Sequence, residues 1–352
     1  MRREPAESVT LKPRVDAALR EFVENEVAEF ELIDPRLAPV GARLREAVSG
    51  GKRIRAAFCY WGWRACGQAD TDAVVRAAAS MELVHAAAIT HDDLIDDSAL
   101  RRGVPSAHVA LLDALPGLPD RAWAARSLAM LAGDLLMSWA GQLFATCGLP
   151  AAFLARARPL WSVLARELIA GECLEILHTG ATDSPQDSLR IIRYKTAKYT
   201  VEHPLQIGGR LGGASAALLA AFTAYGVPLG EAFQLRDDLL AVYGDPAQTG
   251  KSNLDDLAGA RPTALVALAT RDSTPDDREE LHSLLGRADL AAPDLERVRK
   301  ILERSGARER VEQMIAQRTR AAHAALTRVP LLDAVAATAL HELADTVTER
   351  RA

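Results

Sequence analysis

The chain has 352 residues, of which 49% are hydrophobic, 25% charged and 5% aromatic, and its net charge is −5 at neutral pH. This is an ordinary globular composition, with enough apolar residues for a large core. The slightly negative balance argues against a nucleic-acid-binding surface. The four cysteines have no metal-binding or disulfide-type spacing, so we expect reduced core residues.

The composition also predicts the fold class. Ala and Leu are abundant and alternating β-branched runs are scarce, which predicts an all-α protein. Length alone suggests about two domains. We nevertheless expect a single domain over residues 1–352, flexible at 1–11, because two acidic motifs in different halves need each other. The N-terminus lacks the apolar core of a signal peptide, and no uninterrupted apolar run of transmembrane length stands out. We therefore expect a cytoplasmic protein without a membrane span.

The first predicted elements are amphipathic helices at about 12–30 and 39–48, separated by the helix-breaking Asp34-Pro35. The sequence SGGKRIR at 49–55 then precedes an apolar helix at 56–66. The cations of this segment lie at a helix N-terminus, where the helix dipole disfavours positive charge, so a bound anion would relieve an unfavourable arrangement. A basic surface turn explains the same residues without any ligand.

The segment 81–103 reads MELVHAAAITHDDLIDDSALRRG, and its first part is a predicted helix because it is rich in Ala, Leu, Ile and Met. A spacing of three and four residues places an apolar stripe and two carboxylates on one face: Met81, Val84, Ala88, Asp92 and Asp96. The segment therefore predicts an apolar shaft with an anionic end.

The anionic end has the chemistry of a magnesium and diphosphate site. Asp92 and Asp96 lie one turn apart, with side chains roughly 5–6 Å from each other, and they repel unless a cation lies between them. Incomplete chelation by hard oxygen ligands suits Mg²⁺, and the guanidinium groups of Arg101 and Arg102 match phosphate geometry. A solvated acidic face is the commoner explanation of one such motif. His85 lies off the stripe, and a lone helical histidine is more often packed or exposed than a ligand.

A second acidic motif makes chance a poor explanation. The sequence FQLRDD at 233–238 again has apolar residues behind its carboxylates, and long helices are predicted between the two motifs, at 121–147, 150–178 and 185–211. Two such anionic ends can face each other across one cavity.

The intervening helices contain further candidate site residues, and each has two possible interpretations. Glu172 and Glu175 are either buried near the site or simply exposed. Lys195 and Thr196 either reach the cavity or are a solvated lysine and a threonine bonded to its own helix. A Gly-, Asp- and Lys-rich loop at 244–263 is expected to cover the cavity mouth. Residues from about 274 onward are helical in pattern, without an assignable motif.

With both acidic motifs, GGKRIR and the Lys195-Thr196 pair in hand, the chain resembles the trans-isoprenyl (polyprenyl) diphosphate synthases from about residue 12 to the C-terminus. HDDLIDDSALRRG at 91–103 is similar to that family's first aspartate-rich motif, DDxxDxxxxRRG, and FQLRDD is similar to its second. The resemblance implies the isoprenoid synthase fold, a single-domain bundle of about ten or more helices around a deep central cavity. It also implies a homodimer and three bound Mg²⁺ ions.

The resemblance implies roles for individual residues. Magnesium would be held by Asp92, Asp96 and Asp237, with Asp93 and Asp238 supporting them. The allylic diphosphate would be held by Arg101, Lys195, Gln234 and Lys251. Isopentenyl diphosphate would be held by Lys52, Arg55, His85 and Arg102. Thr196 and Gln234 would lie near the proton that is lost, so the predicted catalytic set is Asp92, Asp96, Lys195, Thr196, Gln234 and Asp237.

Four positions depart from the family pattern. Ala241 stands where many members have a third aspartate, and Glu172 and Glu175 stand where Gln and Asp are common. Arg261 replaces a frequent lysine, which keeps the charge but changes the reach. We expect these departures to change the rate and not the reaction type.

The apolar stripe predicts product length, because an isoprene unit is about as long as one helical turn, about 5 Å. Ala87 and Ala88 lie one turn below Asp92, where C15-forming members tend to have an aromatic ring, and Val84 and Met81 mark the next turns. We therefore predict head-to-tail condensation of isopentenyl and allylic diphosphates to a product longer than C15, geranylgeranyl diphosphate (C20). Longer polyprenyl products, a class I terpene cyclase and a non-catalytic subunit of a heteromeric synthase are the alternatives.

Overall fold

The structure is a computed structural model that describes residues 6–181, 183–245, 252–328 and 333–349, with side chains described from residue 11 onward. These residues form two compact units: Met1–Ala157 with Ile207–Gly213, and Arg158–Gln206 with Ala214–Ala352. The divisions fall inside two helices, α7 (Ala151–His178) and α9 (His203–Gly212). We call these the first and second units and describe each by itself. The expectation of a single domain stays a prediction.

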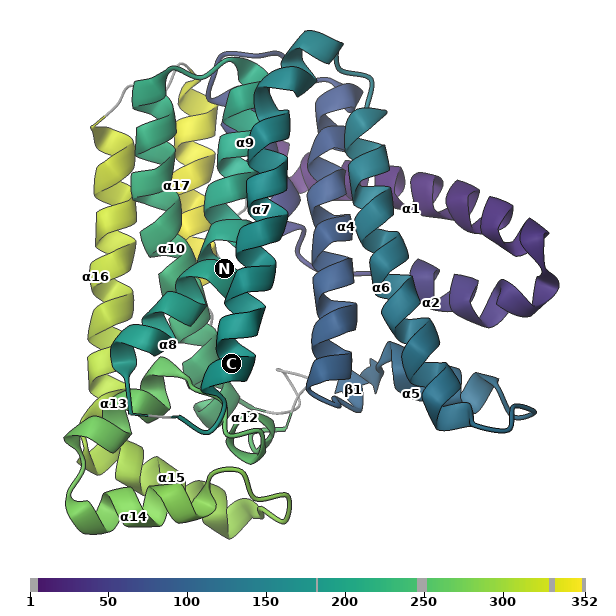
Figure 1. The fold of residues 1–352 in the computed structure, drawn as a ribbon. Helices are drawn as coiled ribbons and strands as arrows, with labels where there is room; N and C mark the ends of the chain where they lie inside the picture. Colours follow the sequence, from purple (N-terminus) through teal and green to yellow (C-terminus); the bar gives the residue numbers. More distant parts are fainter. Residues whose placement is uncertain (1–5, 182, 246–251, 329–332, 350–352) are drawn as a thin grey trace. The chain divides into compact units, whose positions relative to one another are not determined.

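The first unit is helical apart from one small hairpin (Figure 1). Its complete elements are α1 (Ala6–Ile33), the 3₁₀ turn η1 (Pro35–Leu37), α2 (Ala38–Ala47), α3 (Ile54–Arg64), α4 (Asp72–Ile95), β1 (Leu100–Arg101), β2 (Val104–Pro105), α5 (Ala107–Ala114) and α6 (Arg121–Ala145). Helix α1 starts at Ala6 and so includes residues 6–11, which the sequence had placed in a flexible end.

Helix α4 is the centre of the first unit and packs along α3 and α6. It begins where the Thr71 hydroxyl accepts a hydrogen bond from the backbone N–H of Val74, at 3.3 Å. Helix α3, which packs against it, carries large buried rings, including Phe58 and Trp61. After α4 ends, the two-residue turn Arg102-Gly103, with φ of 54° and 79°, folds β2 back on β1. This hairpin returns Arg101 to the end of α4, where it contacts Asp92 and Asp93.

The second unit is built on α10 (Ala216–Tyr243), which packs beside α16 (Ala307–Thr327) (Figure 1). Its other complete elements are α8 (Pro185–Ile191), the π-helix η2 (Ile192–Glu202), α12 (Asp255–Ala258), α13 (Ala264–Asp272), α14 (Pro275–Leu284), α15 (Ala292–Arg304) and α17 (Ala334–Thr348). Leu235 and Leu239 of α10 share one apolar core with α13, α15 and α16. The all-α prediction is confirmed for the described residues, whose only strands are β1 and β2.

Three helices have the length and hydropathy of a membrane span, by length and composition only: α4, α6 and α10. None of the three is an uninterrupted apolar run, because charged residues such as Glu82, Asp134 and Glu231 lie within them. The buried share of the relevant window is 72% in α4, 44% in α6 and 50% in α10.

Candidate active site

The first acidic motif closes α4. Asp96 is the C-terminal cap of the helix, and its backbone N–H donates to the Asp92 carbonyl oxygen at 2.9 Å. Asp93 is almost fully buried, and Arg101 of β1 pairs with it, with 2.9 Å from Nε to Oδ1. A second contact of 3.2 Å joins Arg101 Nη2 to Asp92 Oδ2. Arg101, which was predicted to hold a diphosphate, therefore forms ion pairs with the carboxylates of Asp92 and Asp93 in the structure.

A cluster of cations gathers near the glycine turn of the first unit. A Cβ on Gly51, whose φ is +94°, would lie 3.4 Å from Nη1 of Arg102. Burial lowers the pKa of His85 well below its ordinary value, and repulsion from Arg55 and Arg102 lowers it further. Burial and the nearby arginines also lower the pKa of Arg102. Neutral His85 and these mutually repelling guanidinium groups form a region where a bound anion would be stabilised.

The start of α3 differs from expectation. Glu82 of α4 accepts a hydrogen bond from the Ala56 backbone N–H at 2.9 Å. Arg53, in a left-handed conformation with φ of 54°, pairs with Asp16 at 2.6 Å. The chain's own carboxylates therefore offset part of the positive charge at this helix end, and the anion site expected there stays a prediction. Sequence spacing gave no sign of Glu82, because it approaches from another helix.

The second acidic motif is tied to the π-helix η2 by neutral hydrogen bonds. Thr196 Oγ1 donates to Gln234 Oε1 at 2.9 Å, and Gln234 Nε2 donates to Asp238 Oδ1 at 2.9 Å. Three of the predicted residues are thus in one chain of contacts.

Burial raises the pKa of Asp238 to about 8; the Gln234 hydrogen bond opposes this, and repulsion from Asp256 and Asp237 adds to it. Asp256 of α12 was not among the predicted residues. Its only sequence signal was an acidic pair within the loop expected to cover the cavity. Asp238 Oδ2 is buried without a hydrogen-bond partner among the described residues.

Lys195 is held by the two glutamates whose place the sequence left open. Its Nζ lies 2.6 Å from Glu175 Oε1 and 2.9 Å from Glu172 Oε2. Arg261 extends the cluster, with 3.4 Å from its Nε to Asp256 Oδ1 and 3.8 Å from its Nη1 to Glu175 Oε1. Glu172 and Glu175 therefore belong to the site in the second unit.

The remaining predicted residues are placed as follows. Met81, Val84 and Ala87 are fully buried on α4, whereas Ala88 is only partly buried. Lys52 is exposed. The backbone oxygen of Ala241 accepts a hydrogen bond from Asn253 at 2.9 Å, so this position anchors the following loop. Lys251 lies outside the described residues.

A metal fits the chemistry of these groups. Among the described residues, no three His, Cys, Asp or Glu side chains converge as a ready metal site. The orphaned carboxylate oxygen of Asp238, beside Asp237, is a hard oxygen ligand of the type that Mg²⁺ prefers, as are Asp92 and Asp96. Sites that bind Mg²⁺ together with a substrate phosphate need only one or two carboxylates from the protein.

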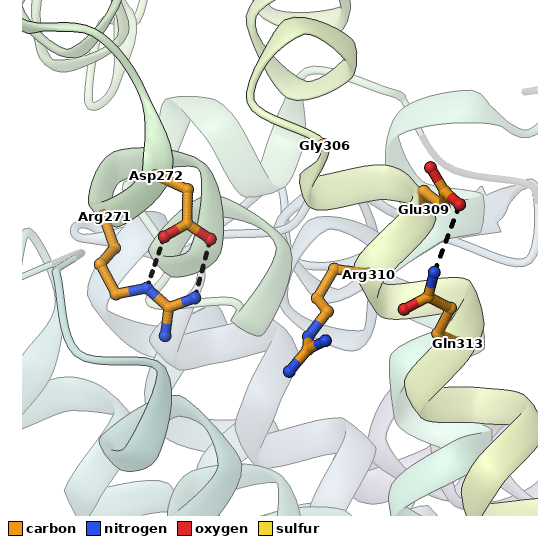
Figure 2. Close-up of a pocket in the computed structure, with 6 residues that line it drawn as sticks. All are labelled: Arg271, Asp272, Gly306, Glu309, Arg310 and Gln313. Carbon is orange, nitrogen blue, oxygen red and sulfur yellow. Dashed lines mark hydrogen bonds and ion pairs between the residues drawn. The ribbon is translucent and has the colours of Figure 1, made fainter.

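A separate hollow in the second unit contains none of the predicted residues. Figure 2 shows its lining, in which Arg271 pairs with Asp272 through two contacts of 2.7 Å and Gln313 bonds Glu309 at 3.2 Å. Four of its six lining residues thus pair with one another, and the Arg310 side chain lies between the two pairs in this view (Figure 2).

Comparisons with known proteins agree with the two motifs. The model of the polyprenyl synthetase family matches residues 40–303. A geranylfarnesyl diphosphate synthase of Aeropyrum pernix is 32% identical over 335 residues, which are 94% of this chain and 99% of that protein. A short chain isoprenyl diphosphate synthase of Methanothermobacter thermautotrophicus is 32% identical, covering 86% of this chain and 87% of that protein.

A solved structure is also similar over nearly the whole length. It is a geranylgeranyl pyrophosphate synthase of Corynebacterium glutamicum, complexed with isoprenyl diphosphate and magnesium. The TM-score is 0.92 at 34% identity, and the match covers 97% of this chain and 99% of that one.

Proposed function

The chain belongs to the polyprenyl synthetase family and is a trans-prenyltransferase that makes prenyl diphosphates, and we propose that its product is geranylgeranyl diphosphate. The proposed reaction is a magnesium-dependent, head-to-tail condensation of isopentenyl diphosphate with an allylic diphosphate. The observation that carries it is the set of contacts around each acidic motif within its own unit. In the first unit Arg101 pairs with Asp92 and Asp93. In the second unit Gln234 bonds both Asp238 and Thr196, which follows Lys195 in the chain.

The proposed residue roles are those that the family resemblance implies. Lys195 and Arg101 would hold the allylic diphosphate, with Lys251 and Gln234, while Lys52, Arg55, His85 and Arg102 would hold isopentenyl diphosphate. Asp92, Asp96 and Asp237 would hold magnesium, with Asp93 and Asp238 supporting. When bound, magnesium supplies positive charge that stabilises the departing diphosphate. Three ions are part of the proposal, as is one cavity served by both acidic motifs.

The proposed chemistry balances without a protein nucleophile. The allylic C1–O bond breaks and its electron pair leaves with the diphosphate, whose charge Lys195 and Arg101 offset. The double bond of isopentenyl diphosphate then attacks C1, held in place by its own cationic residues. The C2 carbon of the isopentenyl unit then loses a proton to the departed diphosphate. This step would take place near Thr196 and Gln234, which are hydrogen-bonded to each other. Apolar residues of α4 would exclude water from the carbocation.

Product length is proposed from α4. Ala88 is a small, partly buried residue one turn from Asp92, so a growing tail is not stopped there by a ring. The relatives named above differ in product length, which leaves a longer polyprenyl product as the second candidate.

The test is incubation of the purified protein with isopentenyl diphosphate and a labelled allylic diphosphate, with and without Mg²⁺. We expect a C20 product that disappears without Mg²⁺ and in the Asp92→Ala and Asp237→Ala variants. A longer product corrects the chain length. Hydrocarbon release would indicate a cyclase, and silence would indicate a non-catalytic subunit.

The homodimer is also a proposal, supported by the family resemblance alone. The cytoplasmic location is a proposal that rests on the N-terminal sequence, which lacks the apolar core of a signal peptide. Light scattering of the purified protein tests the first. Fractionation of cells tests the second, and it is needed because three helices have the composition of membrane spans.

A further inference from the structure

The segment that carries Lys195 and Thr196 has an unusual backbone. Residues Ile192–Glu202 form a π-helix of 11 residues, between the α-helices α8 and α9. The π-helix is rare, occurs mostly as single turns, and is frequent at functional sites. A segment of this length needs support from its neighbours, because the sequence itself favours an ordinary helix over 185–211.

Helix α7 approaches this segment at a glycine. A Cβ built on Gly171 would lie 2.2 Å from the backbone nitrogen of Lys195, 2.6 Å from its Cα and 2.6 Å from the carbonyl carbon of Tyr194. Only a residue without a side chain allows so close a contact between two backbones. Gly171 therefore sets how closely α7 can lie against Lys195.

Helix α10 makes the same kind of approach on other residues of the segment. A Cβ on Gly230 would lie 2.4 Å from Ala197 Cα, and a Cβ on Gly226 would lie 2.8 Å from Glu202 Cα. Two helices thus fix the π-helix through its backbone at three separate points.

The side chains next to Gly171 act on the same lysine. Glu172 and Glu175 follow it on α7, and both carboxylates contact Lys195 Nζ, at 2.9 and 2.6 Å. The main chain and the side chain of Lys195 are therefore both held by one turn of α7.

We propose that this turn of α7 is a positioning device for Lys195, in which Gly171 fixes the backbone and Glu172 and Glu175 fix the ammonium group. The assignment rests on the proposed function, since it explains how the lysine that would hold the allylic diphosphate is placed. It makes Gly171, Glu172 and Glu175 positioning residues that act through Lys195. The two glutamates, which depart from the family pattern, then serve as counter-ions of this lysine.

The experiment compares Gly171→Ala with two matched glycine variants in steady-state assays. We expect Gly171→Ala to lower kcat/KM for the allylic diphosphate about 100-fold, the cost of a 1 Å misplacement, and to leave KM for isopentenyl diphosphate unchanged. Gly226→Ala strains the same π-helix far from Lys195, so it should lower Tm and keep kcat/KM. Gly141→Ala on α6, where nothing lies within 4 Å, should change neither.

Coupling to Lys195 separates positioning from a general structural role. If Gly171 acts through Lys195, the Gly171→Ala/Lys195→Ala double variant should be no less active than Lys195→Ala alone. Additive losses in the double variant, or equal losses of kcat/KM in Gly171→Ala and Gly226→Ala, would overturn the assignment. An inactive wild-type protein would instead overturn the proposed function, and the assignment with it.

A second pair of variants decides the matter if Gly171→Ala does not fold. Glu175→Ala should lower kcat/KM for the allylic diphosphate about tenfold, a loss of about 1.4 kcal/mol, whereas Glu175→Gln, which still accepts a hydrogen bond from Lys195, should recover part of it. Glu175→Ala should add nothing to Lys195→Ala. Full activity in Glu175→Ala, or no rescue by Gln, would contradict the proposal.

Discussion

The two acidic motifs stabilise their carboxylates in different ways. The first stands at the C-terminal end of α4, where the helix dipole disfavours negative charge, and Arg101 offsets that charge by pairing with Asp92 and Asp93. The second stands inside α10, where Asp238 receives a neutral hydrogen bond from Gln234 and its pKa is raised to about 8, chiefly by burial.

Because of this difference, we expect the two motifs to respond to different changes. The first motif is balanced by the chain's own arginine, so its integrity should depend on that arginine. The second leaves a buried carboxyl group that is stabilised by a proton or a cation. We therefore expect the first motif to be sensitive to mutation of its partner and the second to be sensitive to pH.

The largest stability effect is expected at Arg101. Arg101→Gln leaves the buried Asp93 carboxylate without its counter-ion and should lower the free energy of unfolding by about 3–5 kcal/mol. Chemical denaturation measures this loss. The matched control is Arg126→Gln, which removes an exposed pair with Asp97 and should cost less than about 1 kcal/mol. Equal losses in the two variants would remove the contrast between the motifs.

In contrast to the loss at Arg101, a gain in stability at alkaline pH is expected from replacing Asp238. Its folded-state pKa of about 8 lies above the ordinary 3.8, so the folded protein holds this proton more tightly than the unfolded chain. Stability should therefore fall as pH rises from about 4 to about 8 and then level off. Asp238→Asn should remove this fall and raise the free energy of unfolding at pH 9 by about 1–3 kcal/mol.

Thermal unfolding of the metal-free protein at several pH values measures the Asp238 effect. Added Mg²⁺ should raise the wild-type Tm at pH 9 more than that of Asp238→Asn. Identical pH slopes in the two proteins would mean that Asp238 is not the responsible group.

The smallest effect on the folded state is expected on the apolar stripe of α4. Ala88→Phe, at a partly buried position, should keep the protein folded and shorten the product. Ala87 is fully buried, so Ala87→Phe should instead cost about 1–3 kcal/mol of stability through overpacking. Chromatography of labelled products and denaturant midpoints measure the two outcomes. An unchanged product spectrum in Ala88→Phe would place the chain-length determinant elsewhere.

The features that the sequence predicted well are local ones. The helix that presents Asp92 and Asp96, and the run that presents Asp237, follow from spacing within one segment, and both are helical in the structure. The long helices α6 and α7 have ends within a few residues of the predicted ones for the same reason.

The features that the sequence missed depend on contacts between segments. The Glu82 carboxylate at the start of α3 and Asp256 near Asp238 come from distant parts of the chain. The segment 185–211 was predicted as one helix, but α8, η2 and α9 divide it. No periodicity in the segment reveals the π-helix, because its supports, Gly171 and Gly230, lie on neighbouring helices.

The most direct test of the central proposal is a crystal structure with an unreactive thio analogue of the allylic diphosphate and with Mn²⁺ in place of Mg²⁺. Anomalous scattering would locate each ion. We expect one diphosphate whose bound ions contact Asp92 on one side and Asp237 on the other. Ions at only one of these aspartates, or two unconnected sites, would contradict the proposal that both acidic motifs serve the same reaction.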